Sequence, residues 1–381
     1  MMTNRFDLLC NGTVGFVDYP GRVIVIVQLG RGARRLAHHR CAGVPGAVAT
    51  PTRARRLPKD TGRFYIAQNE ARNPGHPLEP LFRAVLLSRP SFNLGEVDLV
   101  SDRNNLRKLF SFVDPASDRN GLTPFTINVE VVGSTVVFCR DGTETVRVVG
   151  AHQFMGYNHE FEKAHTVNSI EGSTGHYRII SYRFGDHKLV VRHELSGHCS
   201  DVQAASATAD ALADSLSLLA LTPADTPARA AGPDSKLRIK EQGNLVPLES
   251  TMELKTRAMS NGIVLAHVVT QLWVAQTPKL VRACHDRGLF VEPRVEDVGA
   301  YVKSWEATNQ NHLRNLSGLT GKIVELARGH GDGAMFTLSY ELAENKLVLR
   351  KACRPRMLPN DLYSTLVIDD TSPTIKEKAE K

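Results

Sequence analysis

Three short runs in the middle of the chain carry carboxylates, and one of them combines a carboxylate with a group that can handle phosphate. That run is Glu253-Leu254-Lys255. Because residues i and i+2 of a strand face the same side, we expect Glu253 and Lys255 to project together while Leu254 turns into the core. The carboxylate of such a pair can bind a divalent cation, and the ammonium can stabilise a phosphate or orient an attacking water. On spacing alone, a surface ion pair is the stronger interpretation.

Two further glutamates precede this run. Glu194 follows the apolar run Leu189-Val190-Val191, so its carboxylate is predicted where a buried strand leaves the core. A carboxylate there needs a partner, which can be a metal, Arg192 or a histidine. Glu162 follows a glycine and several aromatic residues, a pattern typical of a tight backbone approach. Three carboxylates and a lysine, which we expect on separate strands, suit Mg²⁺ or Mn²⁺ because hard cations prefer oxygen ligands.

Other kinds of site find less support in the sequence. His193 and His198 flank Glu194, but the second histidine follows the first by five residues rather than four, so the zinc hydrolase motif is not matched. The sequence contains no P-loop, no dinucleotide-binding glycine motif after a strand and no nucleophile elbow. Its six cysteines are scattered without a CxxC pair, which argues against a zinc ribbon or a thioredoxin motif.

The charge of the chain is unevenly distributed. The formal net charge is +7, which favours a polyanionic partner such as nucleic acid. Between Asp18 and Asp60 the chain has eight arginines and no acidic residue. This segment can track phosphates or form a disordered leader, and the sequence leaves both alternatives open. No stretch reaches the roughly 18 apolar residues of a membrane helix, and the first residues lack the order of a secretory signal, so we expect no membrane partner.

The elements that must position these residues are mainly hairpins with a few helices. Alternating apolar residues around short turns predict hairpins over 126–140, 177–194 and 335–350. Helical spacing predicts helices over 77–87, 263–274 and 301–328 and a short one after Arg103. The fold class is therefore α+β, with mixed sheets flanked by helices. We expect an arginine-rich segment over 1–60, one domain over 61–365 with an inserted loop at 204–235, and a charged tail over 366–381.

The order of these motifs resembles the DXO/Rai family of eukaryotic RNA 5′-end decapping enzymes, over residues 102–291. The site of that family carries an arginine, a glycine-aromatic-glutamate motif, a Glu-Φ-Asp motif, a Glu-Φ-Lys motif and a glutamine, where Φ is an apolar residue. The matching positions are Arg103, the run Gly156 to Glu162 with two extra residues inside it, Glu194-Leu195-Ser196, Glu253-Leu254-Lys255 and Gln271.

The resemblance implies a role for each matching residue. The metal-binding residues for Mg²⁺ or Mn²⁺ would be Glu162, Glu194, Glu253 and Leu254. The catalytic residues would be Glu253, Lys255 and Gln271, and the residues that contact RNA would be Arg103, Lys255 and Gln271.

The resemblance also implies a fold and an activity. The fold is a mixed-sheet nuclease core of the PD-(D/E)XK kind, with the site in a cleft between sheets. The activity is removal of an incomplete cap, an NAD-type cap or a 5′ triphosphate from RNA. Some members of the family degrade RNA from 5′ to 3′, and some bind a 5′–3′ exoribonuclease. The resemblance favours the nucleus over the cytoplasm as the location.

Ser196 departs from the family pattern. It stands where the family has an aspartate, so the site has three carboxylates instead of four, and we expect weaker binding of a second metal. A second hypothesis follows, in which the chain is a catalytically weakened RNA-end-binding protein or an exoribonuclease adaptor. The fold alone would also allow a nuclease that acts on DNA.

Overall fold

A computed structural model describes most of the chain. It describes residues 55–142, 144–167, 173–198, 228–241, 246–291 and 293–366, and the backbone of four strands between residues 7 and 36. The predicted insertion lies outside the described residues as far as residue 227, and the predicted tail lies outside them from residue 367. Both remain predictions.

The larger sheet has twelve strands in the described part of the chain and contains all three predicted hairpins. Its strands are mixed in direction, because β13 pairs with β12 antiparallel and with β7 parallel. In spatial order the strands are β15 (Arg229–Ala230), β16 (Arg238–Glu241), β2 (Val14–Asp18), β3 (Arg22–Ile26), β12 (Ser173–Phe184), β13 (His187–Glu194), β7 (Leu99–Asp102), β9 (Thr135–Asp141), β8 (Phe125–Val132), β21 (Met335–Glu341) and β22 (Lys346–Lys351), with β1 (Asp7–Leu8) beside β12.

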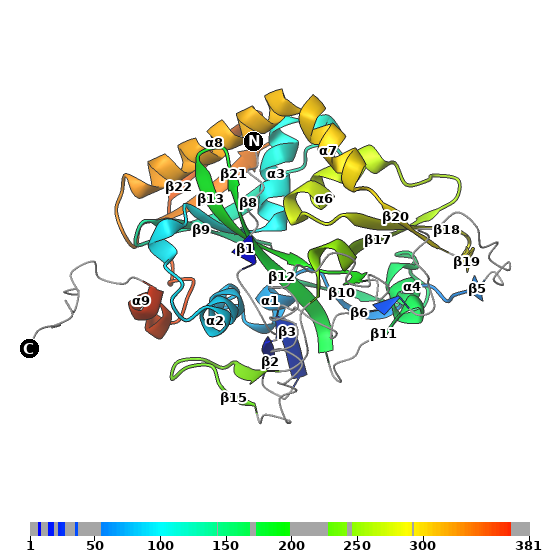
Figure 1. The fold of residues 1–381 in the computed structure, drawn as a ribbon, viewed down its shortest axis with the longest axis horizontal. Coiled ribbons are helices and arrows are strands. Elements are labelled where there is room, and N and C mark those ends of the chain that lie inside the picture. The colour runs from blue at the N-terminus through cyan, green and yellow to red at the C-terminus, as the bar shows by residue number, and fades with distance from the viewer. Residues whose placement is uncertain are drawn as a thin grey trace, which may run out of the picture.

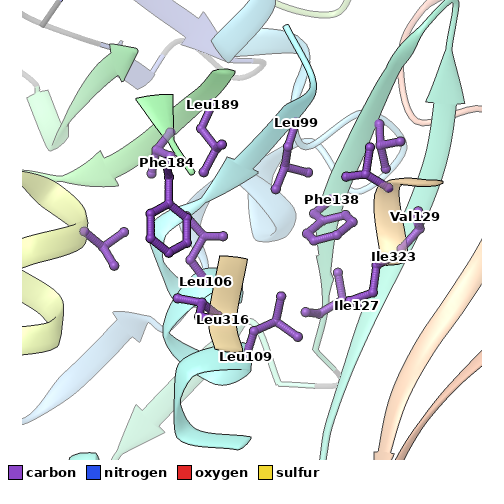
Figure 2. Close-up of a cluster of buried hydrophobic side chains, with 14 of the residues drawn as sticks. Leu99, Leu106, Leu109, Ile127, Val129, Phe138, Phe184, Leu189, Leu316 and Ile323 are labelled. Atoms are coloured by element: carbon purple, nitrogen blue, oxygen red, sulfur yellow. The ribbon is translucent and has the colours of Figure 1, made fainter. Parts of the chain in front are cut away.

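Both faces of this sheet are buried under helices (Figure 1). Neighbouring residues of a strand face opposite sides, so Leu99 packs under α3 (Arg103–Val113) and α8 (Gln310–Arg328), whereas Val100 packs under α2 (Glu79–Ser88) and α9 (Asn360–Leu366). Figure 2 shows the first of these two clusters, in which Leu106 and Leu316 meet side chains of the sheet. This is the α+β fold that the sequence predicted.

The second sheet carries the Glu253 strand. Its described strands, in order, are β11 (Thr166–Val167), β4 (Arg35–Leu36), β14 (Gly197–His198), β17 (Thr251–Ala258), β18 (Lys279–Asp286), β19 (Leu289–Phe290) and β5 (Arg55–Arg56), with β20 (Arg294–Asp297) beside β18. Leu254 packs with Phe161 of α4 (Asn158–His165), whereas Leu280 packs with Leu272 of α6 (Val269–Ala275). The two helices therefore cover opposite faces of the β17–β18 pair.

Two predicted helices differ from the structure. The segment 263–274 begins with a 3-10 turn at Leu265–His267, and α6 starts only at Val269. The segment 301–328 is divided into α7 (Gly299–Thr308) and α8 at Asn309, whose backbone leaves the helical conformation with φ of −105° and ψ of 21° and whose side chain donates to the Trp305 carbonyl. The remaining α-helix of the described residues is α1 (Gln68–Arg72), and β6 (Gly62–Tyr65) and β10 (Val146–Val149) form a small sheet. Short 3-10 turns lie at Leu94–Glu96, Pro115–Ser117 and Leu248–Ser250. None of the described helices has the length and apolarity to cross a membrane.

Candidate functional site

One cleft, of about 620 Å³, brings together all the residues that the sequence singled out as a site. Strands of both larger sheets bound it, as the resemblance predicted, and α3, α4, α6 and β6 complete its walls. The predicted residues that line it are Arg103, Glu162, Glu194, Ser196, Glu253, Leu254, Lys255 and Gln271.

Glu253 holds three polar side chains in this cleft. Its Oε1 accepts a hydrogen bond from Lys255 Nζ at 2.8 Å and one from Gln271 Nε2 at 2.5 Å, and its Oε2 accepts one from Arg103 Nη1 at 3.0 Å. Leu254 is turned the other way, into a cluster of buried apolar residues. The prediction that Glu253 and Lys255 share a face is therefore confirmed. Because the Leu254 side chain is apolar, only its backbone carbonyl could be a metal ligand.

The carboxyl group of Glu253 is ionised at neutral pH. Only 5% of the residue is exposed, and this burial alone would raise its pKa. The positive charges of Lys255 and Arg103 and their hydrogen bonds outweigh that effect and lower the pKa to about 2. The cleft therefore contains a fixed negative charge that the positive side chains of Lys255 and Arg103 more than balance.

Strand pairing explains why the cleft opens at Glu253. Along one edge of β17, β14 pairs only with Thr251 and Met252, so the pairing ends one residue before Glu253. The chain reaches β14 from β13, and Ser196 lies in this connection between the two sheets. Glu194 ends β13 and is exposed, as expected for a strand that leaves the core. The end of the β14 pairing leaves room for a cleft between Glu194 and Glu253.

Glu162 lies on a helix, so the prediction that its carboxylate stands on a strand is wrong. The helix is α4, whose N-terminal backbone amides at His159 and Glu160 donate to the buried Asp60 carboxylate. Gly156 precedes the helix with a φ of +141°, a conformation that a side chain would disfavour. The close backbone approach at the glycine was predicted from the sequence, but the glutamate that follows it was assigned to the wrong element.

Arg103 is positioned by an ion pair beside it. Asp102 ends β7 and accepts hydrogen bonds from Nε and Nη2 of the buried Arg192 at 2.6 and 2.9 Å. These two residues are directly opposite in the parallel β7–β13 pair. The pair fixes the junction at which α3 begins, and Arg103 reaches Glu253 from the first residue of that helix. Arg192 was predicted as one of the candidate partners of Glu194, and its pairing with Asp102 was not predicted.

Part of the cleft wall was not predicted from the sequence. Arg63, Phe64 and Tyr65 of β6 line the cleft, and the Phe64 ring stacks on His159 with their centroids 4.1 Å apart. Tyr177 of β12 lines it as well. An aromatic pair at 64–65 was a detectable signal, but nothing in the sequence placed the short strand β6 against the site.

The donor groups of the cleft match a hard divalent cation. Glu162, Glu194 and Glu253 supply carboxylate oxygens, which Mg²⁺ and Mn²⁺ prefer. In this conformation both oxygens of Glu253 are held by other side chains, and the described residues contain no group of three histidine, cysteine or acidic side chains arranged to hold a metal. The competing zinc hypothesis gains no support, because no such group forms around His193 in the described part of the chain, and its Nδ1 contacts the Glu194 carbonyl.

Comparison with protein families places residues 38–366 in a family described as a domain of unknown function, DUF8563. No curated protein matches the chain.

Solved structures of Rai1 have the same fold. Rai1 of Candida albicans, in complex with pU5 and Mn²⁺, has a TM-score of 0.59 at 10% identity, with 96% of each chain covered. Rai1 of Scheffersomyces stipitis, in complex with (3′-NADP)⁺ and calcium ion, has a TM-score of 0.53 at 11% identity, with 94% of this chain and 97% of that chain covered. These matches confirm the DXO/Rai resemblance as a resemblance of fold.

Proposed function

We propose that this chain, which belongs to the DUF8563 family, is a metal-dependent hydrolase that acts on the 5′ ends of RNA. The observation that carries the proposal is the single cleft lined by Arg103, Glu162, Glu194, Glu253, Lys255 and Gln271. The Candida albicans Rai1 structure, which has this fold, is a complex with pU5 and Mn²⁺. The proposed substrates of the present chain are RNAs that carry an incomplete cap, an NAD-type cap or a 5′ triphosphate.

Each side chain has a proposed task. Glu162, Glu194 and Glu253 would hold Mg²⁺ or Mn²⁺, and Arg103 would grip a phosphate of the RNA. When bound, the cation supplies charge neutralisation at the phosphate and a lowered pKa for the attacking water. Gln271 and Lys255 would orient that water and the phosphate, because both already reach the same oxygen of Glu253.

Binding of the cation would rearrange the contacts of Glu253. At least one of its oxygens would have to exchange a protein donor for the cation, since Arg103, Lys255 and Gln271 hold both of them. Lys255 is the better candidate to move, because 33% of its side chain is exposed against 15% for Arg103. A released Lys255 ammonium would then be available to the phosphate.

The experiment uses three RNAs that carry a 5′ triphosphate, an NAD cap or an unmethylated cap. Each is incubated with the full chain and Mn²⁺, and the released 5′ product is measured. We expect release from at least one RNA, and Glu253→Gln should abolish it while retaining the folded circular dichroism spectrum. Glu325→Gln, which changes an exposed glutamate of α8, is the matched control. If the folded protein releases nothing from any of the three RNAs, the proposal is wrong.

Ser196 supports a second candidate, a protein that binds RNA ends with little turnover. This serine lines the cleft at the position where the resembling family has an aspartate. If the chain is a decayed enzyme, Ser196→Asp should raise product release at least tenfold above a near-zero wild-type rate. If wild type is fully active, the same variant should change the rate little, and the second candidate falls.

Two wider proposals rest on the resemblance alone. We propose a nuclear location and an association with a 5′–3′ exoribonuclease. Imaging of the tagged protein and co-purification from its own cells would test them.

A further inference from the structure

A second hollow, of about 460 Å³, adjoins the cleft and shares Lys255 and Gln271 with it. Its lining includes Arg107, Arg119, Arg257 and His267, and Asp118 is the one acidic residue among its described lining residues. We call this space the basic hollow. Three glutamates and three positively charged side chains line the cleft, so the balance of charge changes from neutral to basic across the two shared residues.

Two rows of side chains connect the cleft to the basic hollow. On β17, Glu253, Lys255 and Arg257 occupy alternate positions and so share a face, which carries the row roughly 13 Å along the strand. On α3, Arg103 and Arg107 are four residues apart and therefore lie one turn apart on one side of the helix. In each row the first residue lines the cleft and the last lines the basic hollow.

The cations of the basic hollow are only partly neutralised within the protein. Arg107 meets Asp118 at 3.6 Å, but burial and then the nearby charge of Arg103 lower the pKa of its guanidinium. Arg119 and Arg257 make no ion pair in the described part of the chain. An anion in the hollow would relieve the repulsion among these groups and would contact three guanidinium groups.

We propose that the basic hollow holds the phosphate backbone of a single RNA strand whose 5′ end lies in the cleft. This inference rests on the proposed function and adds the direction of the bound RNA. From its 5′ end at Glu253, the RNA would pass Lys255 and reach Arg257. The described lining of the hollow offers no phenylalanine, tyrosine or tryptophan for a base to stack on, so recognition there is through phosphates and independent of sequence.

The test measures binding separately from hydrolysis. Fluorescence anisotropy gives the affinity of the full chain for a 5′-phosphorylated uridine dinucleotide and an octanucleotide, with Ca²⁺ in place of Mn²⁺. The variant is the pair Arg119→Gln and Arg257→Gln, and each single variant is measured as well. Arg314→Gln, an exposed arginine of α8 outside both hollows, is the matched control.

We expect the double variant to bind the octanucleotide roughly tenfold more weakly and to lose most of the advantage of the octanucleotide over the dinucleotide. The slope of log affinity against log salt concentration should fall by about 0.7 for each phosphate contact removed. Arg314→Gln should match wild type.

Two outcomes separate this inference from the proposed function. If the double variant matches wild type in octanucleotide affinity and salt slope while wild type releases 5′ products, only the basic hollow is wrongly assigned. If wild type neither binds these RNAs nor releases products, the proposed function fails and this inference fails with it.

Discussion

Replacing Glu253 with glutamine tests how the charges of the cleft are balanced. The variant keeps a buried polar side chain of the same shape and removes the negative charge that Arg103 and Lys255 share. Arg103 and Lys255 then remain close together in a space where Glu253 was 5% exposed. The fold should therefore lose stability, in addition to any loss of activity.

The size of this loss follows from the pKa of Glu253. A tenfold change in an acid constant corresponds to about 1.4 kcal/mol, so lowering the pKa from 4.5 to about 2 stabilises the folded chain by about 3 kcal/mol at neutral pH. The pKa is lower in the folded chain than in the unfolded chain. The stabilisation is therefore complete above the unfolded pKa and is lost as the pH falls toward the folded pKa.

Urea unfolding of wild type and Glu253→Gln at several pH values measures this contribution. We expect the difference in free energy of unfolding to be about 3 kcal/mol at neutral pH, about 2 kcal/mol near pH 3.5, and close to zero near pH 2. Glu325→Gln should track wild type throughout, because its ion pair is exposed. A difference that stays constant with pH, or one below about 1 kcal/mol at neutral pH, would refute the reasoning.

Three further changes test other parts of the molecule. Ser196→Asp adds a carboxylate to the cleft, so calorimetry should show Mn²⁺ binding roughly tenfold more tightly, and an unchanged affinity would place Ser196 away from the cation. Arg192→Met leaves the Asp102 carboxylate without its arginine and should lower the free energy of unfolding in urea by about 3 kcal/mol. A loss below about 1 kcal/mol would contradict this expectation. At Gly185 an added Cβ would lie 2.2 Å from the Ser317 hydroxyl, whereas at Gly121, which also has a positive φ, it would meet nothing within 4 Å. Gly185→Ala should therefore lower the free energy of unfolding by at least about 1 kcal/mol more than Gly121→Ala. Equal losses would exclude the clash.

The hairpins were predictable because their signals are local. Apolar residues alternate on both sides of a turn at 126–140 and at 177–194, and the structure pairs Val132 with Thr135 and Phe184 with His187. Alternation also gave the correct orientation of Glu253, Leu254 and Lys255, since the period of a strand is fixed by its backbone.

The contacts across the cleft could not be predicted from spacing. Arg103 and Glu253 are 150 residues apart, and the sequence has no signal that pairs one arginine with one glutamate over that distance. Arg103 begins the helix after β7, and Glu253 lies on β17 of the other sheet. The two side chains meet only because long-range packing brings the two sheets together. The order of motifs in the resembling family supplied the grouping that residue patterns alone could not.

The position of Glu162 illustrates a different difficulty. The segment Asn158–His165 is short and polar, and its only buried residue is Phe161. The sequence therefore has no apolar face at helical spacing that would predict this helix. The helix is favoured by tertiary contacts instead, since Asp60 satisfies two of its first amides and Phe161 packs against Phe290. Both partners lie about a hundred residues or more away in sequence.

Under the proposed function, the charges that line the cleft bear on how a serine at 196 would affect cation binding. Arg63, Arg103 and Lys255 contribute three positive charges, and Glu162, Glu194 and Glu253 contribute three negative charges, so the formal charge of the lining is +3 − 3 = 0. An aspartate at 196 would make it negative and favour a cation even without RNA. With serine, a divalent cation alone leaves an excess of positive charge, which a phosphate of the RNA would offset. Under the proposed function, cation and RNA end therefore favour each other's binding, and the affinity for each should be reported in the presence of the other.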